Sequence, residues 1–159
     1  MVSEKAAGIK EKLSDTREEL IDLAGELTDD QWNLAVFGED SDWQVIDIVR
    51  HVADSERGMT NLMKQIKEGR DGVPPDFDID RWNRRAVSKL QHKSPQELLE
   101  WMNENRMELI SFIDTLDEDD WDKKGRHASL RIMSIEEICH LIADHEHMHL
   151  LGVRQAFVK

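Results

Sequence analysis

Residues 134–155 read SIEEICHLIADHEHMHLLGVRQ, and this stretch decides the fold. Ser134 is followed three residues later by Glu137, the capping-box pattern that begins a helix. Apolar residues such as Ile138 and Ile142 then recur at three- and four-residue steps, which places them on one stripe of a helical wheel. The stretch therefore predicts a long amphipathic helix that runs almost to the end of the sequence.

The same periodicity predicts three more long helices. We expect them over residues 4–27, 43–66 and 94–113. Capping boxes at Ser94-Pro-Gln-Glu97 and Ser41-Asp-Trp-Gln44 begin two of them. A short helix is expected over 79–90, and the only candidate strand, 129–133, is short. Four long helices without a sheet predict an all-α four-helix bundle, a single domain over residues 1–159.

Two pairs of segments suggest an internal repeat. Leu27-Thr-Asp-Asp-Gln-Trp32 is echoed by Leu116-Asp-Glu-Asp-Asp-Trp121, each after a long helix. Val52-Ala-Asp-Ser-Glu56 is echoed by Ile142-Ala-Asp-His-Glu146 at nearly the same offset. The repeat predicts two related helical hairpins that pack about a pseudo-two-fold axis.

Composition narrows the classes of partner. The chain carries 21 basic and 34 acidic side chains and a formal charge of −13, so its surface repels nucleic acid and anionic lipid. The sequence has no apolar run of about eighteen residues, which argues against a membrane span, and its N-terminus lacks the apolar segment of a secretory signal. Cys139 is the only cysteine, which fits a reducing cytoplasm. We expect a cytoplasmic protein that acts on a small molecule.

Four histidines in the last predicted helix separate into two pairs. A rotation of about 100° per residue places His145 and His149 within the buried stripe, and His140 and His147 on the opposite, solvent face. Two imidazoles one turn apart in a core must each find a partner, and one divalent metal ion satisfies both. The alternative is a pair of core histidines hydrogen-bonded to backbone or carboxylates.

The letters HEHMH at 145–149 also match H-E-x-x-H, a zinc-protease pattern. The longer form of that pattern fits at Gly152 but needs a third histidine where Gln155 stands. No sheet is predicted that could hold an extended peptide by strand pairing, so a protease is disfavoured. Glu146 falls just outside the buried stripe, and we expect it to be solvated or salt-bridged rather than a general base.

A third ligand is available upstream. His51 lies at the edge of the apolar stripe of the second predicted helix, where it would face a neighbouring helix of a bundle. The alternative is a boundary histidine hydrogen-bonded to Asp47 or Asp54. His92 and His127 fall in loop-like segments and are expected to be exposed.

The order of these segments resembles a known family. Trp43-Gln-Val-Ile-Asp-Ile-Val-Arg-His51-Val-Ala-Asp-Ser-Glu56 precedes a loop with Asp76-Phe-Asp-Ile-Asp-Arg-Trp-Asn83, and His145-x-x-x-His149 follows in the last helix. This arrangement is similar to the DinB-like superfamily of four-helix bundles, which includes the bacillithiol and mycothiol S-transferases. Trp82 and Asn83 match the family's loop, but the sequence assigns them no chemical role.

The resemblance implies a cofactor, a co-substrate and an assembly. It implies a divalent metal ion held by His51, His145 and His149, a low-molecular-weight thiol bound at the metal, and a homodimer. Zinc is expected first, and nickel, iron and manganese also accept imidazole ligands.

The resulting hypothesis is metal-dependent transfer of a small thiol to an electrophile, because a metal cation presents a bound thiol as a nucleophile at neutral pH. Two alternatives stay open. One is hydrolysis by a metal-bound hydroxide at the same three histidines, and the other is a non-catalytic, metal-stabilised binding domain.

Overall fold

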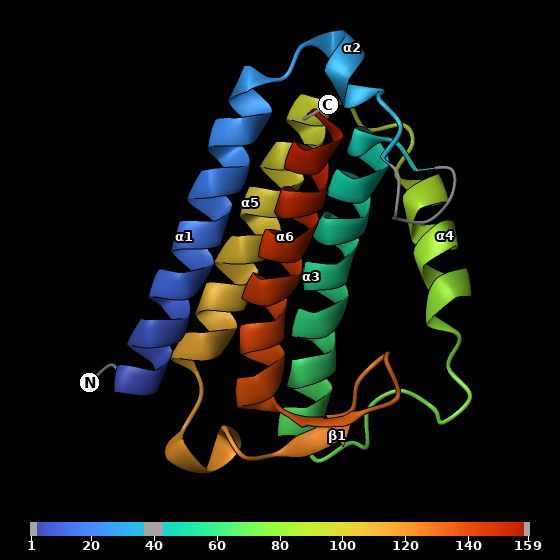
Figure 1. Ribbon diagram of the computed structural model, residues 1–159. Helices are drawn as coiled ribbons and strands as arrows, with labels where there is room; N and C mark the ends of the chain where they lie inside the picture. Colours follow the sequence, from blue (N-terminus) through green and yellow to red (C-terminus); the bar gives the residue numbers. More distant parts are fainter. Residues whose placement is uncertain (1–2, 37–42, 158–159) are drawn as a thin grey trace.

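Four long helices form the body of the protein, as predicted (Figure 1). The structure is a computed structural model that describes residues 3–36 and 43–157. The long helices are α1 (Glu4–Glu26), α3 (Val45–Lys67), α5 (Pro95–Asp114) and α6 (Ile135–Ala156). The shorter elements are α2 (Asp29–Trp32), α4 (Ile79–Lys89), a 3-10 turn η1 (Glu118–Asp120), β1 (Lys124–Arg126) and β2 (Ile132–Ser134). In the described part of the chain, no helix is long and apolar enough to cross a membrane.

Side-chain caps set the beginnings of the helices. Glu137 and its N-cap Ser134 exchange two hydrogen bonds of 3.0 and 3.1 Å, which confirms the predicted start of α6. Ser94 and Glu97 form the same capping box at α5. The sequence predicted that the second long helix begins at residue 43, two residues too early. In the structure Gln44 is the N-cap residue of α3, and its backbone N–H donates to the carboxylate of Asp47, three residues further along the chain. Ser41 lies outside the described residues.

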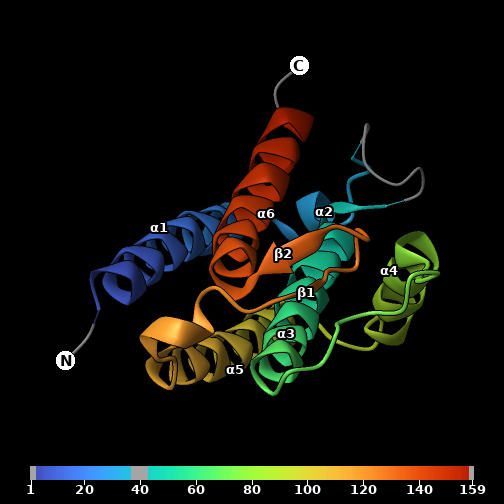
Figure 2. The ribbon, with the colours of Figure 1, turned by 90° about the horizontal axis from the view of Figure 1, so that it is seen from below.

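The long helices α1 and α3 lie diagonally across the bundle, and so do α5 and α6, whereas α3 and α5 lie side by side (Figures 1 and 2). α6 packs against α1 and α3, and α5 packs against α3 and α1. The predicted side-by-side hairpins are therefore not formed. The packing still has the predicted pseudo-symmetry, since exchanging α1 with α5 and α3 with α6 turns the α1–α6 pair into the α3–α5 pair and leaves the pairs α3–α6 and α1–α5 unchanged.

A small antiparallel hairpin closes one end of the bundle, below α3 and α6 (Figure 2). β1 pairs with β2 in the register Gly125↔Met133. The strand predicted over 129–133 is found at 132–134, and its partner β1 was not predicted. The hairpin is tied to the loop after α3, because the Arg126 N–H donates to the Asp71 carbonyl at 2.7 Å and Val73 N–H donates to the Arg126 carbonyl at 2.9 Å.

The interior consists of two apolar clusters stacked along the bundle. One contains Leu13, Met59 and Leu109, and the other contains Leu20, Val52 and Met102. Charged side chains from all four long helices occupy the level between the two clusters: Glu56, Arg106 and Glu146 are buried, and Arg17 of α1 is partly buried. This level also carries the histidines of α6, so the core fixes where the candidate site lies.

Candidate metal centre

Three histidine rings from two helices converge on one point. His51 comes from α3, and His145 and His149 come from successive turns of α6. The Nε2 atom of His145 lies 3.1 Å from Nε2 of His51 and 3.1 Å from Nε2 of His149. One ligand atom from each ring falls within 4.8 Å of the others. The structure thus brings together the three histidines that the sequence singled out, while their binding of a metal ion stays a prediction.

The separations suit a shared cation. Imidazole nitrogens bind zinc at about 2.0–2.1 Å, so two nitrogens on one ion stand about 2.9 Å apart at a right angle and about 3.4 Å apart at the tetrahedral angle. The observed 3.1 Å falls within that interval. The donor set of three imidazoles also suits zinc, nickel or iron.

Burial keeps two of the rings uncharged. Loss of solvent lowers the pKa of His51 to about 3 and that of His145 to about 2, and the neighbouring histidines add repulsion in the same direction. Both rings are therefore neutral at pH 7, and a neutral ring nitrogen offers the lone pair that a metal ion needs. Ser55 Oγ lies 3.4 Å from Nδ1 of His51, on the side of the ring away from the cluster.

The carboxylates proposed as alternative partners of His51 are engaged elsewhere. Asp47 binds Arg50 at 2.7 Å and accepts from the Gln44 N–H. Asp54 accepts a 3.2 Å hydrogen bond from the Trp82 indole. The alternative of a boundary histidine bonded to either aspartate is therefore wrong.

A cavity of about 510 Å³ opens beside the histidines. It runs along α3 and is walled by the segment that carries α4, by α6 and by the turn between β1 and β2. The lining is mostly apolar, and its larger side chains are Met59, Leu62, Phe77, Trp82 and Leu141. His51 and His145 reach this cavity, so a molecule bound there would lie against the histidine cluster.

Trp82 and Asn83 belong to the wall of this cavity, a position that the sequence could not assign. Trp82 is half exposed, packs against Phe77 with ring centroids 5.7 Å apart, and donates its indole N–H to Asp54. Burial raises the pKa of Asp54, although the Trp82 hydrogen bond opposes that shift. The hydrogen bond joins α4 to α3 at the rim of the cavity.

His127 corrects a prediction. The sequence placed it in an exposed loop, but only 8% of its surface is exposed and it lines the cavity. The turn between β1 and β2 folds over the open side of the bundle, and a single-sequence pattern does not show that docking. His92 is exposed as predicted, His140 is exposed, and His147 lies at the surface, 3.4 Å from Glu19.

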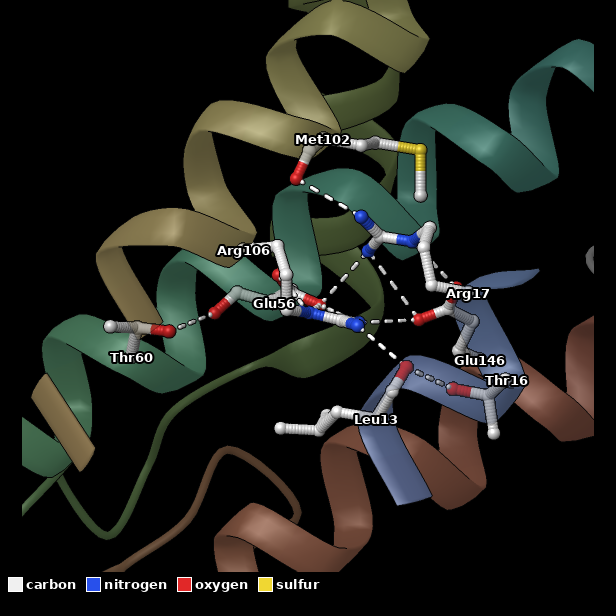
Figure 3. A network of polar contacts seen from close by, with 8 residues as sticks. All are labelled: Leu13, Thr16, Arg17, Glu56, Thr60, Met102, Arg106 and Glu146. Carbon is white, nitrogen blue, oxygen red and sulfur yellow. Dashed lines mark hydrogen bonds and ion pairs between the residues drawn. The ribbon is translucent and has the colours of Figure 1, made fainter. Parts of the chain in front are cut away.

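Glu146 also corrects a prediction. The sequence predicted that Glu146 lies just outside the buried stripe and is either solvated or salt-bridged. In the structure only 1% of its surface is exposed, so it is salt-bridged but not solvated. Figure 3 shows it in a network with Glu56 and two arginines, Arg17 and Arg106. Arg17 Nε donates to one carboxylate oxygen at 2.8 Å and Arg106 donates to the other at 2.8 Å. Two cations and two anions balance, and both Glu146 oxygens are occupied, which disfavours a role as general base.

The sequence profile of the DinB superfamily matches residues 12–152. The chain belongs to the DinB superfamily. The match covers all three clustered histidines and confirms the resemblance on which their predicted role depends.

Two solved structures share the fold of this chain. YfiT from Bacillus subtilis, described as a probable metal-dependent hydrolase with an unusual four-helix bundle topology, matches with a TM-score of 0.79 and 19% identity over 98% of this chain and 88% of its own. A mycothiol-dependent maleylpyruvate isomerase matches with a TM-score of 0.73 and 16% identity over 91% of this chain and 60% of its own. At these identities the two structures support the shared fold.

One curated relative is detectable by sequence. It is a protein of Oceanobacillus iheyensis whose name assigns it provisionally to the metal-dependent hydrolases, and it is 25% identical over 114 residues. The aligned region is 72% of this chain and 64% of the relative, so the chain spans less than two thirds of that protein's length.

Proposed function

We propose that His51, His145 and His149 bind one divalent metal ion and that this site transfers a low-molecular-weight thiol to an electrophile. The observation that carries the proposal is the convergence of three imidazole nitrogens, two of them on rings kept neutral by burial, at the wall of a cavity of about 510 Å³. A divalent cation at this position lowers the pKa of a bound thiol and so presents a thiolate at neutral pH. Zinc is the metal expected first.

The chain's own residues support an external thiol. Cys139, the only cysteine, has no exposed surface, and burial raises the pKa of its thiol to about 12. It contacts the sulfur of Met63 in the apolar core, away from the cavity lining. A thiol nucleophile must therefore arrive with a small molecule, and the apolar cavity beside the histidines provides space for it and for the electrophile. The mycothiol-dependent relative supports this class of co-substrate.

Hydrolysis at the same three histidines is the second candidate, because two relatives are described as metal-dependent hydrolases. A hydrolase of the H-E-x-x-H kind would use Glu146 as its base. Arg17 and Arg106 hold that carboxylate in two hydrogen bonds, which favours thiol transfer over hydrolysis with Glu146 as the base.

Elemental analysis and a turnover assay test the proposal together. We expect one divalent metal ion per chain in the reloaded wild type, and none in His51→Ala or His149→Ala. His140→Ala is the matched control, since His140 lies on the exposed face of the same helix. Turnover of an electrophile should require an added thiol. A wild type without stoichiometric metal overturns the site, and turnover without thiol favours hydrolysis.

The homodimer implied by the family resemblance belongs to the same proposal. Light scattering of the purified protein tests it, with a mass of twice the 18.5 kDa chain expected.

A further inference from the structure

His127 is held in one orientation by its own turn. It lies just after β1, and Ser129 caps its ring, with the Ser129 N–H donating to Nδ1 at 3.1 Å and Ser129 Oγ 2.9 Å from the same atom. Because a backbone N–H can only donate, Nδ1 must accept, and the neutral ring carries its hydrogen on Nε2. Burial and the nearby Arg131 lower the pKa of His127, which favours that neutral form.

The side chain of His127 also borders the cavity. His127 lines the same cavity as His51 and His145. Within residues 3–36 and 43–157, no hydrogen-bonding partner for Nε2 is present, while both contacts of the ring are at Nδ1. The His127 Nε2–H is therefore a donor left available on a residue that lines the same cavity as His51 and His145.

The turn that carries this donor is anchored on two sides. Strand pairing joins Arg126 to Ile132, and the Arg126 main chain also binds Asp71 and Val73 of the loop after α3. A donor on such a support keeps its direction when a substrate binds, which is the property that makes hydrogen bonds effective in a transition state.

We propose that His127 is a catalytic residue of this site, whose Nε2–H binds the carbonyl oxygen of an uncharged, mainly apolar, carbonyl-conjugated alkene. This inference rests on the proposed thiol transfer. The thiolate adds to the far alkene carbon, a carbon–sulfur bond forms, and the alkene electron pair moves toward oxygen, giving an enolate. The Nε2–H stabilises the charge on that oxygen. The enolate then takes a proton at carbon, which balances the proton that the thiol released.

The apolar walls decide the substrate class. Met59, Leu62, Phe77 and Leu141 suit a hydrocarbon body, and the neutral Nε2–H of His127 suits a carbonyl oxygen. Arg131 borders the cavity but is exposed, and its guanidinium contacts the Met133 sulfur.

Histidine side-chain NMR of the metal-free protein tests the donor without metal or thiol. We expect an unprotonated Nδ1 and a protonated Nε2 at His127, and a shift of the Nε2 resonance on adding 4-phenyl-3-buten-2-one. Loss of one neutral hydrogen bond should weaken binding of this enone by up to about tenfold in His127→Leu. His127→Gln keeps a donor near the same place and should bind nearly as wild type. A hydrogen on Nδ1, or equal binding by all three proteins, overturns the proposal.

Rates with two electrophiles separate a catalytic role from a structural one. His127→Leu should lower kcat/KM for the enone by about 10²- to 10³-fold, the cost of removing one oxyanion donor. The rate with benzyl bromide, which has no acceptor oxygen, should fall much less. His92→Leu, at an exposed position, should change neither rate. Equal losses on both electrophiles overturn the proposal. If the wild type transfers thiol to neither electrophile, the proposed function fails, and the NMR result alone decides whether His127 binds the carbonyl.

Discussion

Arg17 and Arg106 each donate to the main chain of the other's helix at the same offset. Arg17 Nη1 binds the carbonyl of Met102, four residues before Arg106, and Arg106 Nη1 binds the carbonyl of Leu13, four residues before Arg17. Each arginine also contacts the same two buried glutamates, at distances of 2.7–3.2 Å (Figure 3). The network therefore repeats the pseudo-two-fold relation of the bundle, and it lies at the level of the candidate site.

This network should dominate the response of the fold to charge removal. Arg106→Met leaves Glu56 and Glu146 with one cation instead of two in a buried site, and breaking such a pair costs about 3–5 kcal/mol. The free energy of unfolding, measured in urea, should fall by that amount.

Lys64→Met provides the matched comparison. Lys64 pairs with Glu108 at 2.6 Å on the surface, where removing an ion pair costs about 1 kcal/mol or less. If Arg106→Met and Lys64→Met destabilise the protein equally, the buried network contributes nothing beyond an ordinary surface pair.

Periodicity could predict the helices but not the depth of Glu146. A helical wheel assigns a residue to the buried face from its apolar neighbours, so a carboxylate at the edge of the stripe is assigned to solvent. In the structure two arginines from other helices neutralise it, and no local pattern contains that information. The echo between Val52–Glu56 and Ile142–Glu146 was the available signal, because it pairs the two buried glutamates.

The same limit of local patterns explains why three of the clustered or cavity-lining histidines could be predicted and His127 could not. His145 and His149 share a face through helical spacing alone, and His51 could be proposed from its place on a second stripe. His127 could not be found in this way. Its burial depends on two three-residue strands and on a loop about 50 residues upstream, contacts that no short pattern encodes.

The metal-free protein should lose stability as pH falls below about 6.5. The pKa of His51 is about 3 in the folded state and near 6.5 when unfolded, so between these values the unfolded chain binds more protons and acid favours unfolding. Each such histidine contributes a slope of up to about 1.4 kcal/mol per pH unit.

Urea unfolding between about pH 6.5 and 4 measures this slope. Carboxylates also titrate in this range, but they contribute equally to all variants, so a difference between variants reports the histidine. His51→Ala removes one titrating group and should make the dependence on pH shallower. His140→Ala, at an exposed position, should keep the wild-type slope. A His51→Ala variant with an unchanged slope would show that His51 is not held neutral by burial.

Two glycines with nearly the same backbone conformation should respond differently to alanine. Gly69 and Gly72 have φ of +92° and +95°, and a side chain at either costs about 1–2 kcal/mol for the left-handed conformation. At Gly69 an added Cβ meets nothing within 4 Å, whereas at Gly72 it would lie 2.3 Å from the carbonyl oxygen of Arg126. Gly72→Ala must therefore also displace β1, and with it the turn that carries His127.

We expect a larger loss of unfolding free energy for Gly72→Ala than for Gly69→Ala in urea, and altered His127 side-chain resonances only in Gly72→Ala. Equal losses with unchanged His127 resonances would mean that the loop after α3 does not hold the turn in place.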